Sequence, residues 1–218
     1  MTQNWPAIQA IASKVLSTKL PGQAELTRYA YDRAQRVMRA IDKLAPAVGE
    51  RVDRADLAKI AAMFAGVAQN VTAPGKSPDD QAYGDAAEVA SDQLKDLLPQ
   101  HDLDAMINIL QEHRKRDTRL PEARVLADAL TLEDFGLIGL WNQNRQFHAS
   151  GKSLEQLLKL WKAQHDYGYW ESRLREGFHY EVARRTARER LAHMKGLYER
   201  LQREQNCEDV ASNVLGHF

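Results

Sequence analysis

Histidines, carboxylates and one short basic run are the side chains of this protein that could carry chemistry. Seven histidines are present, and His-Asp dipeptides occur at 101–102 and 165–166. Imidazole nitrogens and carboxylate oxygens bind the divalent metals that turn water into a nucleophile for phosphate-ester hydrolysis. No two histidines have the H-x-x-x-H spacing that puts two ligands on one helical face. Asp102 follows Pro99 at an expected helix start, where it fits an N-cap better than a metal ligand.

The basic run His113-Arg114-Lys115-Arg116 is a second candidate site. Guanidinium groups bind phosphate oxygens in pairs, so this run could grip a phosphate or a nucleotide. The alternative is a solvated basic turn at the C-terminal end of a helix, where the helix dipole favours cations.

Helical periodicity dominates the chain, and no stretch alternates apolar and polar residues long enough for a sheet. The predicted fold class is therefore all-α. The helix over 24–44 is expected to face inward through residues such as Val37 and Ile41, and Pro121 fits the first position of another helix. Further helices are expected over 5–16, 53–68, 81–98, 102–116, 132–148, after the Ser-Gly of 150–151, and in the stretch 169–205.

The stretch 169–205 carries one apolar seam on a highly charged background. Its members are four or three residues apart, as in a helix that packs along one side. The seam either packs on the protein's own core or pairs with a second copy in a homodimer. It consists of Ala187, Leu191, Met194, Tyr198 and Leu201.

Three tryptophans, Trp141, Trp161 and Trp170, are expected to pack between helices. The alternative is an exposed aromatic patch that meets a partner.

Composition excludes several classes of protein. Lys plus Arg and Asp plus Glu number 30 each, and 44% of the residues are apolar. A net charge of zero gives no strong signal for nucleic-acid binding. No apolar run approaches the roughly 20 residues of a membrane span, so no membrane association is expected and the cytoplasm is the expected location.

Five segments in order resemble the HD-domain phosphohydrolases. The most specific is "EARVLADALTLEDFGLIGL" (122–140), in which Glu122, Asp128 and Gly136 fall in register with the family. Upstream, "ILQEHRKRD" places His113 where the family has a histidine at a helix end. The others are "RAQRVMRAIDKLA" (33–45), "LAKIAAMFAGVA" (57–68) and the closing stretch 153–201.

The resemblance implies a helical bundle with a long charged C-terminal helix, but an incomplete metal site. The family binds its metal through a histidine, an adjacent His-Asp pair and a final aspartate. The corresponding positions here are Arg33, Ala65-Gly66 and Asp128. Alanine and glycine offer no donor atom, and a guanidinium repels a cation. We therefore expect no catalytic residue, no metal and no cofactor. The dipeptide at 165–166 follows Asp128, whereas the family's pair precedes it.

Arg33 supports two expectations at this vestigial site. Its charge could replace the metal cation by pairing with Asp128, which as a buried carboxylate needs a partner. Arg33, His113, Arg114, Lys115 and Arg116 could instead bind a phosphate or nucleotide without hydrolysing it.

The sequence thus predicts a degenerate, non-catalytic HD-like protein that acts by ligand binding or as an interaction or scaffold protein. We expect an N-terminal helix over 1–22, an HD-like core over 23–148, a closing helical pair over 149–206 and a tail over 207–218. An active phosphohydrolase that holds Mn, Fe, Ni or Mg through Asp32, His113 and Asp128 is the alternative. An unrelated helical adaptor is a third reading.

Overall fold

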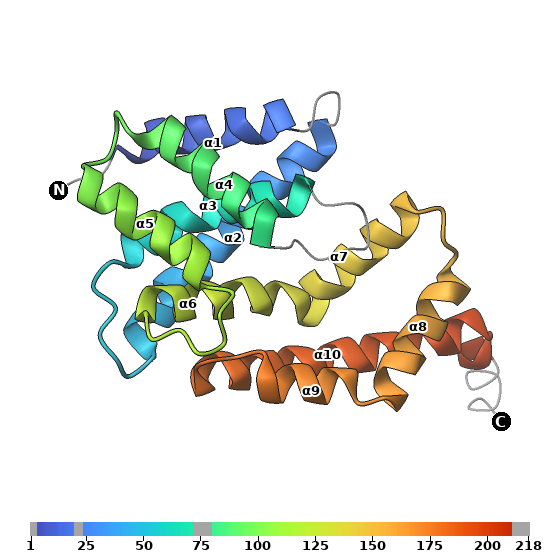
Figure 1. Ribbon diagram of the computed structural model, residues 1–218. Helices are drawn as coiled ribbons and strands as arrows, with labels where there is room; N and C mark the ends of the chain where they lie inside the picture. Colours follow the sequence, from blue (N-terminus) through green and yellow to red (C-terminus); the bar gives the residue numbers. More distant parts are fainter. Residues whose placement is uncertain (1–3, 20–23, 72–79, 211–218) are drawn as a thin grey trace. The chain divides into compact units, whose positions relative to one another are not determined.

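The computed structural model describes residues 4–19, 24–71 and 80–210. Most of these residues are helical and none lies in a strand, which confirms the all-α fold class. None of the described helices is long and apolar enough to cross a membrane. In chain order (Figure 1) the elements are α1 Trp5–Lys19, α2 Ala24–Leu44, η1 Ala45–Ala47, α3 Ala55–Val71, α4 Asp80–Leu94, α5 Gln100–Glu112, α6 Pro121–Thr131, η2 Leu132–Asp134, α7 Gly136–Ala149, α8 Leu154–Asp166, α9 Tyr169–Glu176 and α10 Glu181–Gln205.

The chain separates into two compact units. Unit 1 comprises the described residues up to Thr131 together with His179–Ala183, and unit 2 comprises Leu132–Phe178 and the described residues from Arg184 onward. The sequence predicted a core running to residue 148, but α7 belongs to unit 2, so the division comes after α6. Most of the expected tail over 207–218 lies outside the described residues.

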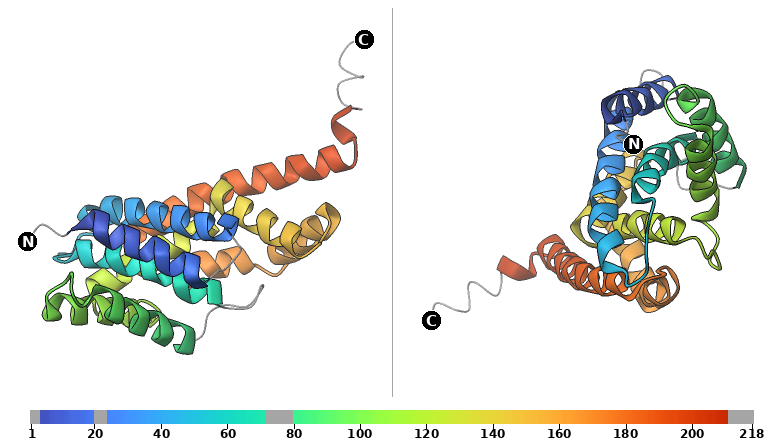
Figure 2. Two further views of the ribbon diagram at one scale, coloured as in Figure 1. Left: turned by 90° about the horizontal axis from the view of Figure 1, so that it is seen from above. Right: turned by 90° about the vertical axis from the view of Figure 1, so that its left-hand side faces the viewer.

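Helix α3 is the centre of unit 1. Helices α1, α2, α4, α5 and α6 all pack against it, and Figure 2 shows α1, α2 and α3 side by side. From Ile60 to Ala68 every α3 side chain is buried. A helix that is apolar on all sides must be surrounded to be stable, and its alanines allow the neighbouring helices to approach closely.

A polar cluster anchors the start of α3. The backbone N–H of Arg54 donates to the buried carboxylate of Glu122 at 2.9 Å, and the Arg54 guanidinium donates to Asp102 at 2.6 Å. This ion pair holds the pKa of the Asp102 carboxyl below its ordinary value. The expected N-cap role of Asp102 is wrong, because the residue lies inside the first turn of α5, whose cap position is Pro99.

An aromatic core organises unit 2. Trp161 of α8 stacks on Tyr198 of α10 with ring centroids 3.9 Å apart, and Trp170 of α9 packs against Trp161 and Phe135 at 5.4 Å. The apolar seam of α10 is buried from Ala187 to Tyr198. Of the two readings of this seam, packing within the protein's own fold is confirmed.

The charged stretch 169–205 forms two helices, α9 and α10. The break follows Gly177, whose backbone N–H closes α9 by donating to the Arg173 carbonyl at 2.8 Å. Phe178, directly after this glycine, is buried against Phe135 with ring centroids 5.5 Å apart.

Replacing Trp161 with alanine is expected to destabilise unit 2 by about 3 kcal/mol, because a large buried ring and its stack on Tyr198 are lost. Urea unfolding followed by circular dichroism measures the change. The matched control is Leu160→Ala, one residue away and 39% exposed, which should change stability by less than about 0.5 kcal/mol. Equal losses of stability in Trp161→Ala and Leu160→Ala would contradict a stabilising role of the aromatic core.

Candidate functional site

A cleft in unit 1 lies where α2, α3 and α6 meet. It encloses about 280 Å³ of space, part of it open to solvent. Most of its lining comes from α2, with two small residues from α3 and one leucine from α6. The lining residues are Tyr29, Ala30, Arg33, Ala34, Val37, Ala62, Gly66 and Leu130.

The cleft follows from helical spacing and side-chain size. Tyr29, Arg33 and Val37 are four residues apart on α2, so they form one row. Opposite this row, Ala62 and Gly66 lie four residues apart on α3. Their small size leaves space at the bottom of the cleft. A Cβ added at Gly66 would meet only the Ala30 carbonyl oxygen, at an ordinary 3.9 Å. The lack of a side chain there therefore opens space in the cleft.

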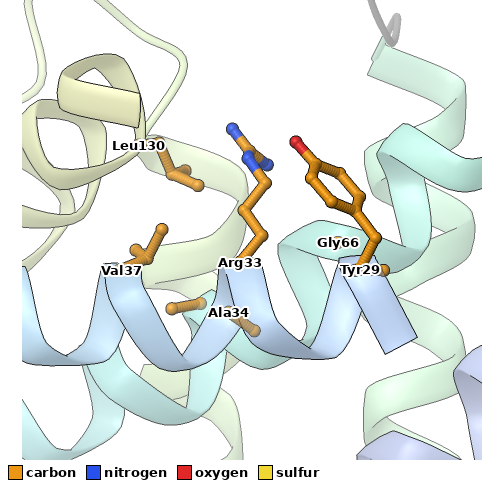
Figure 3. A pocket seen from close by; sticks show the side chains of 8 residues that line it. Tyr29, Arg33, Ala34, Val37, Gly66 and Leu130 are labelled. Carbon is orange, nitrogen blue, oxygen red and sulfur yellow. The ribbon is translucent and has the colours of Figure 1, made fainter. Parts of the chain in front are cut away.

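Two polar groups border this otherwise apolar cleft. Figure 3 shows the Arg33 guanidinium and the Tyr29 hydroxyl extending from α2 on the same side and toward one another. Both groups are hydrogen-bond donors suited to an anion. The eight lining residues include no carboxylate, histidine or cysteine. The lining therefore provides donors for binding but no general base or nucleophile.

Asp128 is fully buried, and both of its oxygens bind backbone N–H groups. Oδ1 accepts from His179 at 2.8 Å and Oδ2 accepts from Tyr180 at 2.9 Å. These two residues immediately precede α10. Charge-assisted bonds near a helix N-terminus are a favourable environment for a carboxylate.

The expected pairing of Arg33 with Asp128 stays a prediction, and the described contacts of the two residues are different ones. Arg33 shares its cleft with Leu130, two residues beyond Asp128 on α6. Side chains two residues apart leave a helix about 200° apart around its axis. Asp128 therefore points to the side of α6 that carries residues 179 and 180.

Further contacts hold Tyr180 to unit 1. Its hydroxyl donates to the Glu50 carboxylate, and Arg124 lies within 3.5 Å of the same carboxylate while donating to the Thr118 carbonyl at 2.7 Å. Burial and the neighbouring Glu50 raise the pKa of the Tyr180 phenol. Sequence reasoning missed this contact, since no local signal links residues 50 and 180.

His113 is buried away from the cleft. Its ring meets Tyr83 edge-on at 4.9 Å, and Nδ1 lies 2.7 Å from the Leu110 carbonyl oxygen, to which it donates as Nδ1–H. Burial, with a smaller contribution from the positive charge of Arg114, lowers the pKa of His113 to about 4. The imidazole is therefore neutral near pH 7 and cannot attract a phosphate by charge.

The basic run after His113 does not join Arg33 in the cleft. Arg114 lies over the Tyr83 ring at 4.9 Å, and Lys115 pairs with Glu112 at 2.5 Å. These residues follow the C-terminal end of α5, and residues 114–117 are exposed. Of the predicted phosphate-binding set, which also includes Arg116, only Arg33 lines the cleft.

The alternative metal site is not assembled. Asp32 is exposed on α2, whereas His113 and Asp128 are buried in the separate contacts described above. Within the described ranges, no three His, Cys, Asp or Glu side chains gather closely enough to hold a metal ion. Ala65, a predicted position of the vestigial site, is fully buried beside Gly66.

Asp128→Asn is expected to destabilise the protein by about 2 kcal/mol, because an amide offers one acceptor where the two backbone N–H groups need two. Chemical denaturation at neutral pH measures the effect. The control is Asp117→Asn, which changes an exposed aspartate and should leave the free energy of unfolding almost unchanged. A neutral Asp128→Asn variant would show that this carboxylate does not anchor the start of α10.

Stability is expected to fall between pH 6.5 and about 4 because of His113. In this window the unfolded imidazole takes up a proton that the folded, buried imidazole does not, so folding loses about 3 kcal/mol as the pH drops. Urea midpoints measured across the window test this. His113→Phe should reduce the dependence of the urea midpoint on pH. His193→Asn, at an exposed position, should leave this dependence unchanged. A slope unchanged in His113→Phe would contradict the assignment.

Comparison of the chain with protein-family models, with curated proteins and with solved structures gave no match.

Proposed function

We propose that this protein is a non-catalytic, HD-like helical protein that binds a small phosphate-bearing ligand in the α2–α3–α6 cleft. One observation carries the proposal. Arg33 and Gly66, which the resemblance aligns with the family's first histidine and with the aspartate of its His-Asp pair, line one cleft beside α6. Their presence in one cleft, 33 residues apart in the sequence, supports the proposal.

The lining favours anion binding. The half-buried guanidinium of Arg33 and the hydroxyl of Tyr29 are hydrogen-bond donors at the edge of a cleft whose other lining residues are apolar or small. Charge-assisted hydrogen bonds of this kind contribute about 1.5–3 kcal/mol each. A phosphate group, as in a nucleotide or a phosphomonoester, presents oxygens on several sides and can accept from both donors.

The same lining supports binding without turnover. Phosphate-ester hydrolysis at neutral pH needs an activated water and a means of neutralising charge in the transition state. The Arg33 charge could neutralise charge in the transition state, but no side chain that lines the cleft could activate a water molecule. The alternative, an active phosphohydrolase using Asp32, His113 and Asp128, is less favoured because these side chains do not converge. The cytoplasm remains the proposed location.

Isothermal titration with inorganic phosphate, pyrophosphate and adenosine monophosphate at low salt tests the proposal. Arg33→Ala should weaken binding at least tenfold, and Tyr29→Phe about fivefold, because each removes a donor at the cleft border. The matched control is Arg39→Ala, an exposed arginine on the same helix, which should bind as the wild type does.

Two outcomes would refute this function. One is wild-type protein that binds none of the three anions. The other is an Arg33→Ala variant that binds as tightly as Arg39→Ala, since binding would then lie outside the cleft. Release of phosphate from the monophosphate would refute the non-catalytic part alone.

A further inference from the structure

The polar and the apolar residues of the α2–α3–α6 cleft lie at different depths. Tyr29 and Arg33 are partly exposed and carry the polar atoms (Figure 3). The other six lining residues are all buried, and none of them has a polar side-chain atom. They are Ala30, Ala34, Val37, Ala62, Gly66 and Leu130. A ligand therefore meets hydrogen-bond donors at the mouth of the cleft and hydrocarbon further in.

This gradient determines how a ligand is oriented. Arg33 brings a positive charge to the mouth, and the guanidinium of Arg36 lies 6.0 Å from the centroid of the Tyr29 ring. An anionic group is stabilised beside these side chains. Deeper in the cleft the same group would lose its water without gaining a hydrogen bond from any lining side chain. The charged end of the ligand therefore stays at the mouth, and the end that enters the cleft is apolar.

The volume of the cleft limits the size of the apolar end. The cleft encloses about 280 Å³, part of it open to solvent. Clefts that hold drug-sized ligands enclose roughly 300–1,000 Å³. A nucleotide would also bring ribose hydroxyls and the polar edge of a base against side chains that offer them no partner. The lining therefore favours a short hydrocarbon group over a nucleoside.

Gly66 provides the space for this group. Among the described residues, a Cβ added at Gly66 would meet only the Ala30 carbonyl oxygen, at 3.9 Å, so packing does not exclude a methyl group there. A glycine inside a helix is less stable than an alanine. A glycine at this position of α3 thus lowers the stability of the helix and keeps the cleft deep.

We propose that the ligand of the cleft is a short-chain alkyl phosphomonoester. Its phosphate lies at Arg33 and Tyr29, and its alkyl group extends inward toward Gly66. Gly66 is then a specificity-determining residue that sets the length of the alkyl chain. This inference rests on the proposed function, the binding of a phosphate group at the mouth, and it narrows the class of ligand.

Isothermal titration of the full chain with inorganic phosphate, methyl phosphate, ethyl phosphate and n-propyl phosphate tests the inference. Each methylene group that leaves water should tighten binding about fourfold. The dissociation constant of n-propyl phosphate should therefore be at least about tenfold lower than that of methyl phosphate. Adenosine monophosphate should bind more weakly than n-propyl phosphate.

Substitutions at Gly66 test where the alkyl group lies. Gly66→Ala should reduce the advantage of n-propyl over methyl phosphate to less than about fourfold, and Gly66→Val should abolish it. The matched control is Gly84→Ala in α4, outside the cleft, where an added Cβ would meet no described atom within 4 Å. It should keep the full dependence on chain length. Both alanine variants should raise the urea midpoint, which separates a filled cleft from misfolding.

The outcomes distinguish this inference from the proposed function. Binding of inorganic phosphate that depends on Arg33, without any gain along the alkyl series, overturns the inference and leaves the proposed function standing. Tighter binding of adenosine monophosphate than of n-propyl phosphate also overturns it. A chain-length dependence that both Gly66 variants retain overturns the placement of the alkyl group. If no phosphate compound binds, the proposed function fails and the inference fails with it.

Discussion

A buried carboxylate satisfied by backbone donors is the constraint on which the architecture of unit 1 depends. Asp128 is removed from water, which is costly for an ionised group unless its oxygens accept strong hydrogen bonds. Its two partners, the N–H groups of His179 and Tyr180, are distant in sequence and stand directly before α10, a helix of 25 residues. The contact fixes the start of α10. It also holds the segment His179–Ala183 in unit 1. Tyr180 strengthens the attachment through Glu50.

The choice of small residues around α2 and α3 explains why the cleft exists and what it can do. Alanines on both helices let the backbones approach, and Gly66 leaves the floor open. Only Tyr29 and Arg33 bring polar atoms to the border. A site of this composition can recognise charge and shape, but it has no group to activate water.

Local signals predicted the elements well and the long-range contacts poorly. The helix over 24–44 was predicted with the bounds of α2, and Pro121 does begin α6, because periodicity and proline geometry act within a few residues. The partners of Asp128, the ion pair of Asp102 with Arg54 and the burial of His113 depend on tertiary packing, which a local pattern does not encode. The exposure of Trp141 differs from the predicted packing, because a tryptophan usually packs inside whereas this side chain is 64% exposed.

The metal content of the purified protein would show whether the α2–α3–α6 cleft lacks metal chemistry. The purified protein would be incubated with manganese, iron, nickel and zinc in turn, desalted and analysed by plasma mass spectrometry. We expect far less than one ion per chain with every metal, because Arg33 and the apolar lining offer a cation no ligands. One or more tightly held ions per chain would contradict this expectation and would show that ligands assemble in a way that the cleft does not reveal.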